Sequence, residues 1–184
     1  MRIVAGKQKG IRVNAPKKLP VRPTTDMAKE ALFNILNNDY YFDEISVLDL
    51  FSGIGSISLE FASRGTKDIT SVDKHRGCSR FVASVAEEHD MPIQIINMDA
   101  YKFLEQQSKK FDVIFADPPY DFTDDQFAKI VTLVFDKKLL NENGVLIIEH
   151  SKKTDLATQV NFKKNKKYGG NCFSFFSEIP FNEA

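Results

Sequence analysis

The sequence predicts an α/β fold whose central sheet is mostly parallel and ends in an antiparallel hairpin. From residue 45 onward, short apolar segments alternate with amphipathic ones, which is typical of repeated β-α units. The pattern changes near the end, where residues 160–168 and 172–179 are separated by a Gly-Gly-Asn turn that leaves no room for a helix. The 184 residues, 42% of them hydrophobic, suffice for one domain with a sizeable core but not for two.

A short basic hairpin and a connector are expected at the start of the chain. Residues 2–5 and 10–13 alternate in polarity around a glycine-flanked turn, which indicates two short paired strands. Residues 17–23 read as an extended connector. We therefore divide the chain into an N-terminal hairpin and connector at residues 1–22 and a larger domain at residues 23–184.

Helices and strands of the larger domain follow in order. Three capping side chains at residues 24–26 precede an apolar pattern of period 3.6, so a helix is expected up to about residue 37. The strands expected after it are residues 46–51, 69–73, 93–97, 111–117 and 144–149. The helices expected between them lie near residues 56–63, 77–89, 101–107 and 126–135.

Positive charge is concentrated in two segments although the net charge is zero. Residues 152–167 contain six lysines against the single acid Asp155. The first 22 residues contain no acid and seven bases, which are Arg2, Lys7, Lys9, Arg12, Lys17, Lys18 and Arg22. Such local strips suit a polyanion contacted on one face, although they also suit solvated tails.

Composition argues against a membrane protein and against a metal site. No apolar stretch reaches the roughly 18–20 residues of a membrane span, and the N-terminus lacks the apolar core of a signal peptide. We therefore expect a cytoplasmic protein. Cys78 and Cys172 are expected to be reduced core residues, and neither they nor the three histidines show metal-ligand spacing.

A glycine-containing loop after the first strand of the larger domain is the first candidate cofactor site. Its glycines allow a tight turn and a close ligand approach, but Ser58 stands where the dinucleotide fingerprint has its third glycine. A carboxylate at the strand end would repel a pyrophosphate and attract an ammonium group. The site thus favours S-adenosylmethionine over a nicotinamide dinucleotide. Its candidate cofactor-binding residues are Asp49, Phe51, Ser52, Gly53 and Gly55.

Acidic residues also end the next strands. Asp73, followed by Lys74, is placed to accept hydrogen bonds from ribose hydroxyls, and Asp99 and Ala100 to contact an adenine ring. Each acid alone would also make a good helix cap. Together with Asp117 they outline one continuous crevice.

The tetrapeptide Asp117-Pro118-Pro119-Tyr120 follows a buried strand. Neither proline has an N–H to donate, so the strand must end and its last carboxylate must point into open space. The carboxylate, the Pro118 carbonyl and the Tyr120 ring then form two acceptors and a stacking face in one rigid turn. These groups suit the exocyclic amine of a nucleobase drawn out of its stack. Alternatively, the prolines simply close the strand.

Several stretches together resemble a known family. The methyltransferase motifs at residues 48–55 and 117–120 are shared by many families, whereas residues 1–7 combined with Arg-Pro-Thr-Thr-Asp at 22–26 are much more specific. With residues 30–34, 63–65, 149–150 and 167–169 the resemblance covers nearly the whole chain. On these residues the chain resembles the RsmD family, bacterial methyltransferases that modify a guanine N2 in 16S ribosomal RNA.

The resemblance implies a fold and a mechanism. The fold would be that of class I S-adenosylmethionine-dependent methyltransferases, a Rossmann-like, seven-stranded sheet. Asp117 and the Pro118 carbonyl would accept the two hydrogens of the guanine amine, while Tyr120 stacks on the base. We expect no metal, and a monomer that acts on 16S rRNA in an assembled or assembling small ribosomal subunit.

RNA contact is expected to fall to the N-terminal segment. The residues proposed for it are Arg2, Lys7, Lys9, Arg12 and Arg22 on phosphates, with Thr24 and Thr25 near the mouth of the site. On this view, deletion of residues 2–14 abolishes RNA methylation and leaves cofactor affinity nearly intact.

Three alternatives remain. An adenine-N6 methyltransferase of DNA or RNA would use the same tetrapeptide, although no added target-recognition domain is visible. A non-catalytic RNA-binding or assembly protein could keep the fold, but the intact set of strand-end acids argues against it. A nicotinamide oxidoreductase is disfavoured by Asp49 and the missing third glycine.

Overall fold

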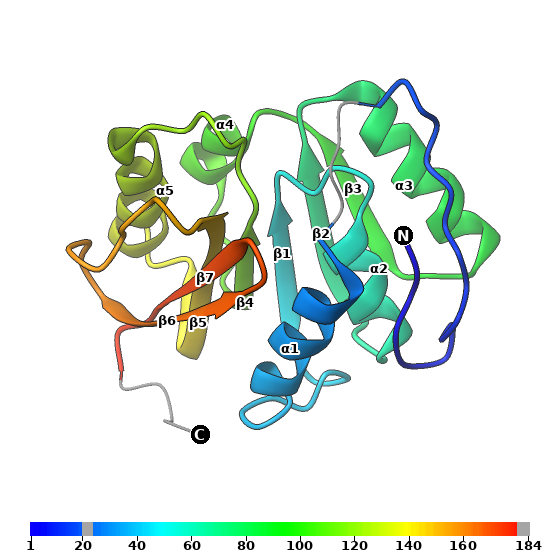
Figure 1. Ribbon diagram of the computed structural model, residues 1–184, viewed down its shortest axis with the longest axis horizontal. Helices are drawn as coiled ribbons and strands as arrows, with labels where there is room; N and C mark the ends of the chain where they lie inside the picture. The colour runs from blue at the N-terminus through cyan, green and yellow to red at the C-terminus, as the bar shows by residue number, and fades with distance from the viewer. Residues whose placement is uncertain (20–23, 180–184) are drawn as a thin grey trace.

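A seven-stranded sheet in the order β3-β2-β1-β4-β5-β7-β6 forms the centre of the protein (Figure 1). The computed structural model describes residues 1–19 and 24–179. β7 runs antiparallel to β5 and β6, and all other neighbouring strands are parallel, so the predicted fold class is confirmed. The strands are β1 (Ser46–Leu50), β2 (Asp68–Asp73), β3 (Ile93–Asn97), β4 (Phe111–Ala116), β5 (Leu140–Ser151), β6 (Phe162–Tyr168) and β7 (Asn171–Phe176).

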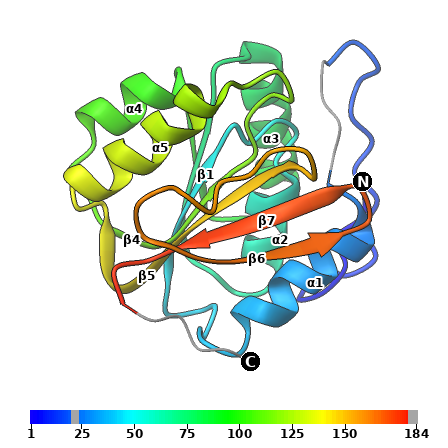
Figure 2. The same cartoon turned by 60° about the vertical axis from the view of Figure 1, so that its left-hand side comes forward.

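Helices cover both faces of the sheet (Figure 2). One face carries α1 (Asp26–Leu36), α2 (Ser56–Ser63) and α3 (Arg76–Glu88), and the other carries α4 (Ala100–Gln106) and α5 (Asp124–Asp136). Successive residues of a strand point to opposite faces. Along β4, Val113 and Phe115 therefore pack toward α1 and α2, whereas Ile114 packs toward α4 and α5. This alternation of buried apolar residues explains why the central strands are apolar throughout.

β5 and β7 differ most from the sequence prediction, whereas β6 begins two residues later than expected and the other strands agree to within one residue. β5 begins four residues earlier than residue 144, because Leu140 pairs with Phe111 across an irregularity in the β4–β5 register. β7 ends at Phe176 rather than at residue 179, since the next amide, that of Ser177, donates to the Asn161 carbonyl outside the ladder. Apolar periodicity cannot reveal either irregularity.

The N-terminal segment is packed into the domain. Its two arms form a single antiparallel bridge, Arg2 with Arg12, rather than two full strands. Ile3 is fully buried and Val13 is nearly so, in a cluster with Leu59 of α2 and Val85 of α3. Residues 1–13 thus share a core with the larger domain.

A buried carboxylate on α2 holds this segment in place. Glu60 is fully buried, and its oxygens accept hydrogen bonds from the backbone N–H groups of Val4 and Ala5, both at 3.0 Å. Lys29 Nζ and Arg64 Nε lie 3.2 and 3.0 Å from the same carboxylate. Deleting residues 2–14 would remove two of these donors and expose the apolar cluster, so such a variant would be unstable and could not test RNA contact alone.

In the part of the chain that the structure describes, no helix combines the length and the apolar character needed to cross a membrane. Cys78 and Cys172 are buried and free.

Candidate functional site

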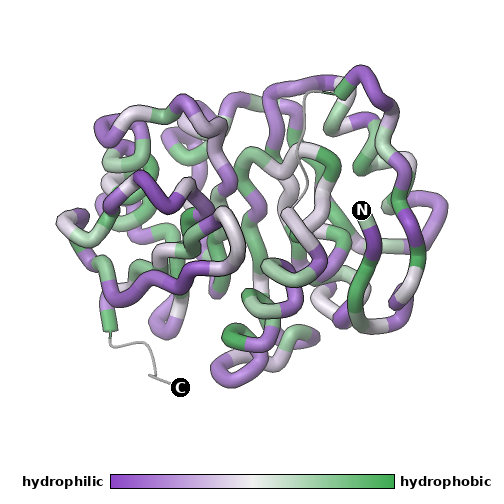
Figure 3. Tube along the Cα trace, in the orientation of Figure 1, coloured by the Kyte–Doolittle hydropathy of each residue, from purple (hydrophilic) through white to green (hydrophobic). Residues whose placement is uncertain are grey.

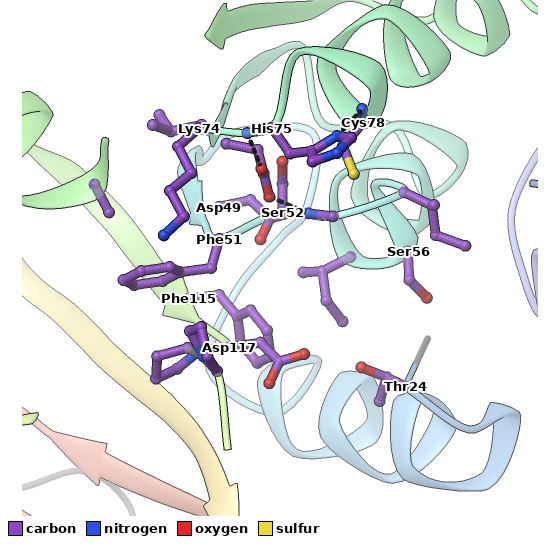
Figure 4. A pocket seen from close by; sticks show the side chains of 18 of the residues that line it. Thr24, Asp49, Phe51, Ser52, Ser56, Lys74, His75, Cys78, Phe115 and Asp117 are labelled. Carbon is purple, nitrogen blue, oxygen red and sulfur yellow. Dashed lines mark hydrogen bonds between the residues drawn. The ribbon is translucent and has the colours of Figure 1, made fainter. Parts of the chain in front are cut away.

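The crevice lies where strand order reverses, between β1 and β4. Open α/β sheets bind ligands at such a switch point, beyond the carboxyl ends of the strands. Leu50 of β1 pairs with Ala116 of β4, which brings Asp49 and Asp117 to neighbouring positions. A cavity of about 540 Å³ opens there (Figure 4), a size suited to a small-molecule ligand.

The loop from β1 to α2 has a backbone that few sequences can adopt. Phe51, Gly53 and Gly55 all have positive φ, at 58°, 53° and 76°, which is costly for any residue but glycine. Gly55 does not line the cavity. A Cβ there would lie 2.9 Å from Val82 Cγ2 of α3, so this glycine lets the two helices pack closely.

Asp49 is only 1% exposed and faces the cavity from β1. Its Oδ2 accepts hydrogen bonds from the backbone N–H and the hydroxyl of Ser58, at 3.0 and 2.6 Å. Burial raises the pKa of Asp49 to about 7, although the two Ser58 bonds oppose that rise, and the charge of Asp73 adds to it. A cationic ligand would stabilise the ionised form.

The carboxylates of Asp73 and Asp99 accept hydrogen bonds from backbone N–H groups and can still accept further hydrogen bonds from a ligand. Asp73 accepts from the backbone N–H of Gly53 at 2.8 Å and of His75 at 2.7 Å. Asp99 caps α4, with Oδ1 accepting from the N–H groups of Tyr101 and Lys102. Each carboxylate oxygen offers two lone pairs, so capping and ligand binding are compatible at both positions.

The Asp117-Pro118-Pro119-Tyr120 loop forms the acceptor side of the cavity. The Asp117 N–H makes a last ladder bond, 3.3 Å to the Leu50 carbonyl, and the prolines end the strand as predicted. The Pro119 carbonyl accepts from Phe122 at 3.1 Å, whereas no described residue donates to the Pro118 carbonyl. Tyr120 is 63% exposed at the cavity rim.

Phe122 fixes this loop to the rest of the domain. Its ring meets Phe51 edge-on at 5.5 Å, lies parallel to Tyr101 at 6.3 Å and meets Phe127 of α5 at 5.7 Å. Such contacts restrain both the loop and the Phe51 turn.

Glu149 is a site residue that sequence reasoning missed. It lines a small groove beside Asp117 and is 4% exposed. Thr24 donates its hydroxyl to Glu149 Oε2 at 3.1 Å, and Asn171 donates to Oε1. Burial is the first cause that raises the pKa of both Asp117 and Glu149, and the Glu149 charge raises the pKa of Asp117 further.

Most of the predicted cofactor residues meet at this cavity. It is lined by Asp49, Phe51, Ser52, Gly53, Asp73, Lys74, Asp99, Ala100 and the whole tetrapeptide from Asp117 to Tyr120. Ser56, His75 and Cys78 line it as well and were not predicted. A serine at a helix start, a histidine cap and an apolar cysteine are common structural features, so the sequence carried no distinct signal for them.

The predicted RNA-binding residues are spread more widely. Thr24 lines the cavity, but Thr25 caps α1 by accepting from Ala28, and Arg2 pairs with Asp26 at 3.1 Å. The remaining three in the described part, Lys7, Lys9 and Arg12, lie on the hairpin. Arg22 lies outside the described residues.

The hairpin tip lies away from the cavity. The Lys7 N–H donates to the Ser63 carbonyl at the last residue of α2, whereas Ser56, at the first residue, lines the cavity. Lys7 and Lys9 are therefore separated from the cavity wall by the length of this helix, about 12 Å.

The cavity residues fit S-adenosylmethionine. Four carboxyl groups, those of Asp49, Asp73, Asp99 and Asp117, face it against the single lysine Lys74, which suits a ligand with ammonium and sulfonium charges. Ser56 Oγ, a cavity-lining hydroxyl, is buried with no hydrogen-bond partner among the described residues. Over those same residues, no group of three or more His, Cys, Asp or Glu side chains could hold a metal ion.

Comparison with known proteins also indicates a methyltransferase. The family described as "Conserved hypothetical protein 95" matches residues 1–177. "Putative rRNA methyltransferase YlbH" of Bacillus subtilis (strain 168) is 32% identical over 165 residues, 87% of this chain and 88% of that protein. "Ribosomal RNA small subunit methyltransferase D" of Haemophilus influenzae is 30% identical over 171 residues, 88% of this chain and 84% of that protein.

Solved structures agree on the fold. The structure described as "Putative methyltransferase yhhF from Escherichia coli" aligns over 96% of both chains with a TM-score of 0.83 at 24% identity. The fold is that of class I S-adenosylmethionine-dependent methyltransferases, as predicted. Family and cavity chemistry together confirm the expected cofactor. The chain therefore belongs to the Conserved hypothetical protein 95 family and is an S-adenosylmethionine-dependent methyltransferase.

Proposed function

We propose that this protein transfers the methyl group of S-adenosylmethionine to the exocyclic N2 of a guanine in 16S ribosomal RNA. The observation that carries the proposal is the position of Asp117 and Pro118 at the rim of the cofactor cavity, with no described residue donating to the Pro118 carbonyl. The small-subunit ribosomal RNA named for the Haemophilus influenzae relative supports the substrate. The motifs at residues 1–7 and 22–26, which are more specific to the family that the chain resembles than the shared methyltransferase motifs, support guanine N2 as the target atom.

The proposed cofactor contacts follow the order of the strands. Asp49 would bind the ammonium group directly or through water, Asp73 the ribose hydroxyls, and Asp99 with the Ala100 backbone the adenine edge. Lys74 follows Asp73 on the cavity wall. When bound, S-adenosylmethionine supplies an electrophilic methyl group on a positively charged sulfur.

Asp117 and Pro118 would prepare the guanine amine. Its lone pair is delocalised into the ring, so the amine is a poor nucleophile. If the carboxylate of Asp117 and the carbonyl of Pro118 each accept one hydrogen, the nitrogen moves toward a tetrahedral geometry with its lone pair directed at the methyl. Pro119 stiffens the turn, and Tyr120 would stack on the base, worth about 1–3 kcal/mol.

Asp117 is also the proposed proton acceptor. The amine that accepts the methyl group must lose one proton, which Asp117 would take, and the electron pair of the broken C–S bond would stay with the cofactor. The raised pKa of Asp117, caused first by burial and then by the Glu149 charge, makes this carboxylate a stronger base than an exposed aspartate.

The N-terminal bases remain proposed phosphate contacts. Arg2, Lys7, Lys9, Arg12 and Arg22 would bind the RNA backbone, with Thr24 and Thr25 near the cavity mouth. Since the hairpin tip is about one α2 length from the cavity, the contacts of Lys7 and Lys9 would fall on nucleotides some distance from the target. Phosphate contacts would offset the few kcal/mol required to extrude a base.

The experiment is methyl transfer from labelled S-adenosylmethionine to unmodified small-subunit particles, naked 16S RNA and duplex DNA, with nucleoside mass spectrometry of each product. N2-methylguanosine from a ribosomal substrate is the expected result. N6-methyladenine would overturn the substrate assignment and keep the cofactor site, and cofactor binding without any product would overturn the proposed activity.

A further inference from the structure

Four lysines gather at the end of the sheet that carries the acceptor side of the cavity. Lys152 and Lys153 follow the last residue of β5, and Lys166 and Lys167 are near the end of β6. We name Lys152, Lys153, Lys166 and Lys167 the C-terminal lysine cluster. The trace is strongly hydrophilic along β6 and along the loop after β5 (Figure 3).

The cluster adjoins the groove beside Asp117. Lys152 directly follows Ser151, and Ser151 and Asn171 both line this groove together with the tetrapeptide. Lys167 pairs with Cys172, the neighbour of Asn171, in the β6–β7 register. Lys152 and Lys153 thus lie between two groove-lining residues, Ser151 and Thr154, and the strand partners of Lys166 and Lys167 lie within two residues of Asn171. The Lys7 and Lys9 tip lies at the far end of α2.

Little negative charge opposes the cluster. Residues 152–176 contain one acid, Asp155, whose Oδ1 accepts from the Ala157 N–H. Among the described residues, none of the four lysines forms an ion pair, in contrast to Lys109 and Lys129 elsewhere. The positive charge of Lys167 acts on Cys172 of β7. Burial raises the pKa of this thiol, and the Lys167 charge lowers it.

Edge protection does not account for the whole cluster. β6 is the last strand of the sheet, and lysines on an edge strand discourage pairing with another chain. That purpose would explain Lys166 and Lys167, but Lys152 and Lys153 lie in the turn after β5, an inner strand between β4 and β7. The two pairs share only their proximity to the acceptor side.

We propose that the C-terminal lysine cluster binds the phosphates flanking the extruded target nucleotide, as a second RNA surface close to Asp117. This inference rests on the proposed function. A nucleotide whose base reaches Asp117 must bring its own backbone to the rim of the cavity beside Tyr120. Phosphate contacts at that rim position the strand without reading its sequence.

Charge-reversal variants test the proposal. Lys166→Glu/Lys167→Glu and, independently, Lys152→Glu/Lys153→Glu each replace two cluster cations. The matched control is Lys67→Glu/Lys110→Glu, two exposed lysines that directly precede β2 and β4, at the opposite ends of the strands from the cavity. The Kd for naked 16S RNA and KM for small-subunit particles are measured over a salt series, together with the S-adenosylmethionine Kd and the melting temperature.

Each cluster variant should raise the RNA Kd by about tenfold and reduce the slope of log K against log salt by about 2, one unit per lost phosphate contact. The control should keep the wild-type slope, and all variants should keep cofactor affinity and melting temperature. Wild-type slope and KM in both cluster variants, with the wild-type enzyme producing N2-methylguanosine, would overturn this inference alone. Absence of that product from the wild-type enzyme would instead overturn the proposed function.

Discussion

Three carboxyl groups with raised pKa values lie at the cavity and the groove beside it. Asp49, Asp117 and Glu149 are buried, and the charges of Glu149 and Asp49 raise the pKa of Asp117 further. Proteins accept such arrangements mainly at functional sites. The crevice is therefore prepared for a positively charged ligand, and its protonation should control both stability and rate.

The pH dependence of methyl transfer should depend on Glu149. As the proposed proton acceptor, Asp117 must be ionised, so the single-turnover rate should rise as pH rises through its raised pKa. Glu149→Gln removes a negative charge that raises the pKa of Asp117, so Asp117 should ionise at a lower pH. We expect the acidic limb of the pH-rate profile to move to lower pH, which quench-flow measurements with saturating cofactor would show.

Glu142→Gln is the control for that profile. Glu142 is an exposed residue at the opposite end of β5 from Glu149, so it makes the same charge change on the same strand away from Asp117. Its profile should coincide with that of the wild type. An acidic limb that stays in place in Glu149→Gln would contradict the proposed role of Asp117.

Asp49→Asn should stabilise the cofactor-free protein and weaken cofactor binding. The pKa of Asp49 is raised to about 7 in the fold, so the native state holds this proton more tightly than the unfolded chain. Its stabilising contribution is full below the ordinary pKa of 3.8 and is lost progressively as pH rises from there to about 7. The variant should melt several degrees above wild type at pH 8 and close to it only at a pH below 3.8, at about 2–4 °C per kcal/mol.

Calorimetric melts at both pH values and titration with S-adenosylmethionine measure the two effects of Asp49→Asn. Asp112→Asn is the matched control for binding, because Asp112 also accepts from a serine N–H and hydroxyl, those of Ser46, but does not line the cavity. Unchanged cofactor affinity in Asp49→Asn would remove Asp49 from the binding site.

At the scale of elements, α2 links the cofactor site to the N-terminal segment. Its first residue, Ser56, lines the cavity, its middle presents Glu60 to the amides of Val4 and Ala5, and its last, Ser63, accepts from Lys7. The basic hairpin is thus positioned relative to the cofactor by one short helix.

Gly6 and Gly10 form a matched pair for testing this attachment. Both have positive φ, 81° and 89°, but a Cβ on Gly6 would lie 1.9 Å from the Ser63 carbonyl oxygen, whereas a Cβ on Gly10 would meet nothing within 4 Å. Gly10→Ala should cost about 1–2 kcal/mol through backbone strain alone. Gly6→Ala should cost roughly 2 kcal/mol more, because the clash forces the segment off α2.

Urea denaturation of the two variants measures that difference in unfolding free energy. Equal losses would show that contact with Ser63 contributes nothing to stability, and that the segment is held by Glu60 and the apolar cluster alone.

Local sequence patterns predicted the helices and strands well, but they did not predict the contacts between segments far apart in the sequence. Alternation of strands and helices and the Gly-Gly turn before Asn171 sufficed for the sheet and its late hairpin. The fully buried pair of Lys29 and Glu60 was not foreseen, because charged side chains on helices are usually solvated. Such a pair depends on contact between segments far apart in the sequence.

For the whole molecule, the candidate site could be predicted where an acid stands at or near a strand end. Asp49, Asp73, Asp99 and Asp117 were predicted in this way and meet at one cavity. Glu149, the last residue of the strand expected at residues 144–149, was not predicted, because only the third dimension brings Thr24 and Asn171 to its carboxylate. The shared core of residues 1–13 was missed for the same reason.

The central claim is that Asp117 presents a guanine amine of ribosomal RNA to the cofactor. The most direct measurement is parallel methyl transfer by wild type and Asp117→Asn to small-subunit particles, with nucleoside mass spectrometry and cofactor titration of both proteins. We predict N2-methylguanosine from wild type and at least about a hundredfold less from a variant that still binds cofactor, the loss typical of a positioned catalytic group. N6-methyladenine from wild type, or wild-type rates from the variant, would contradict the account.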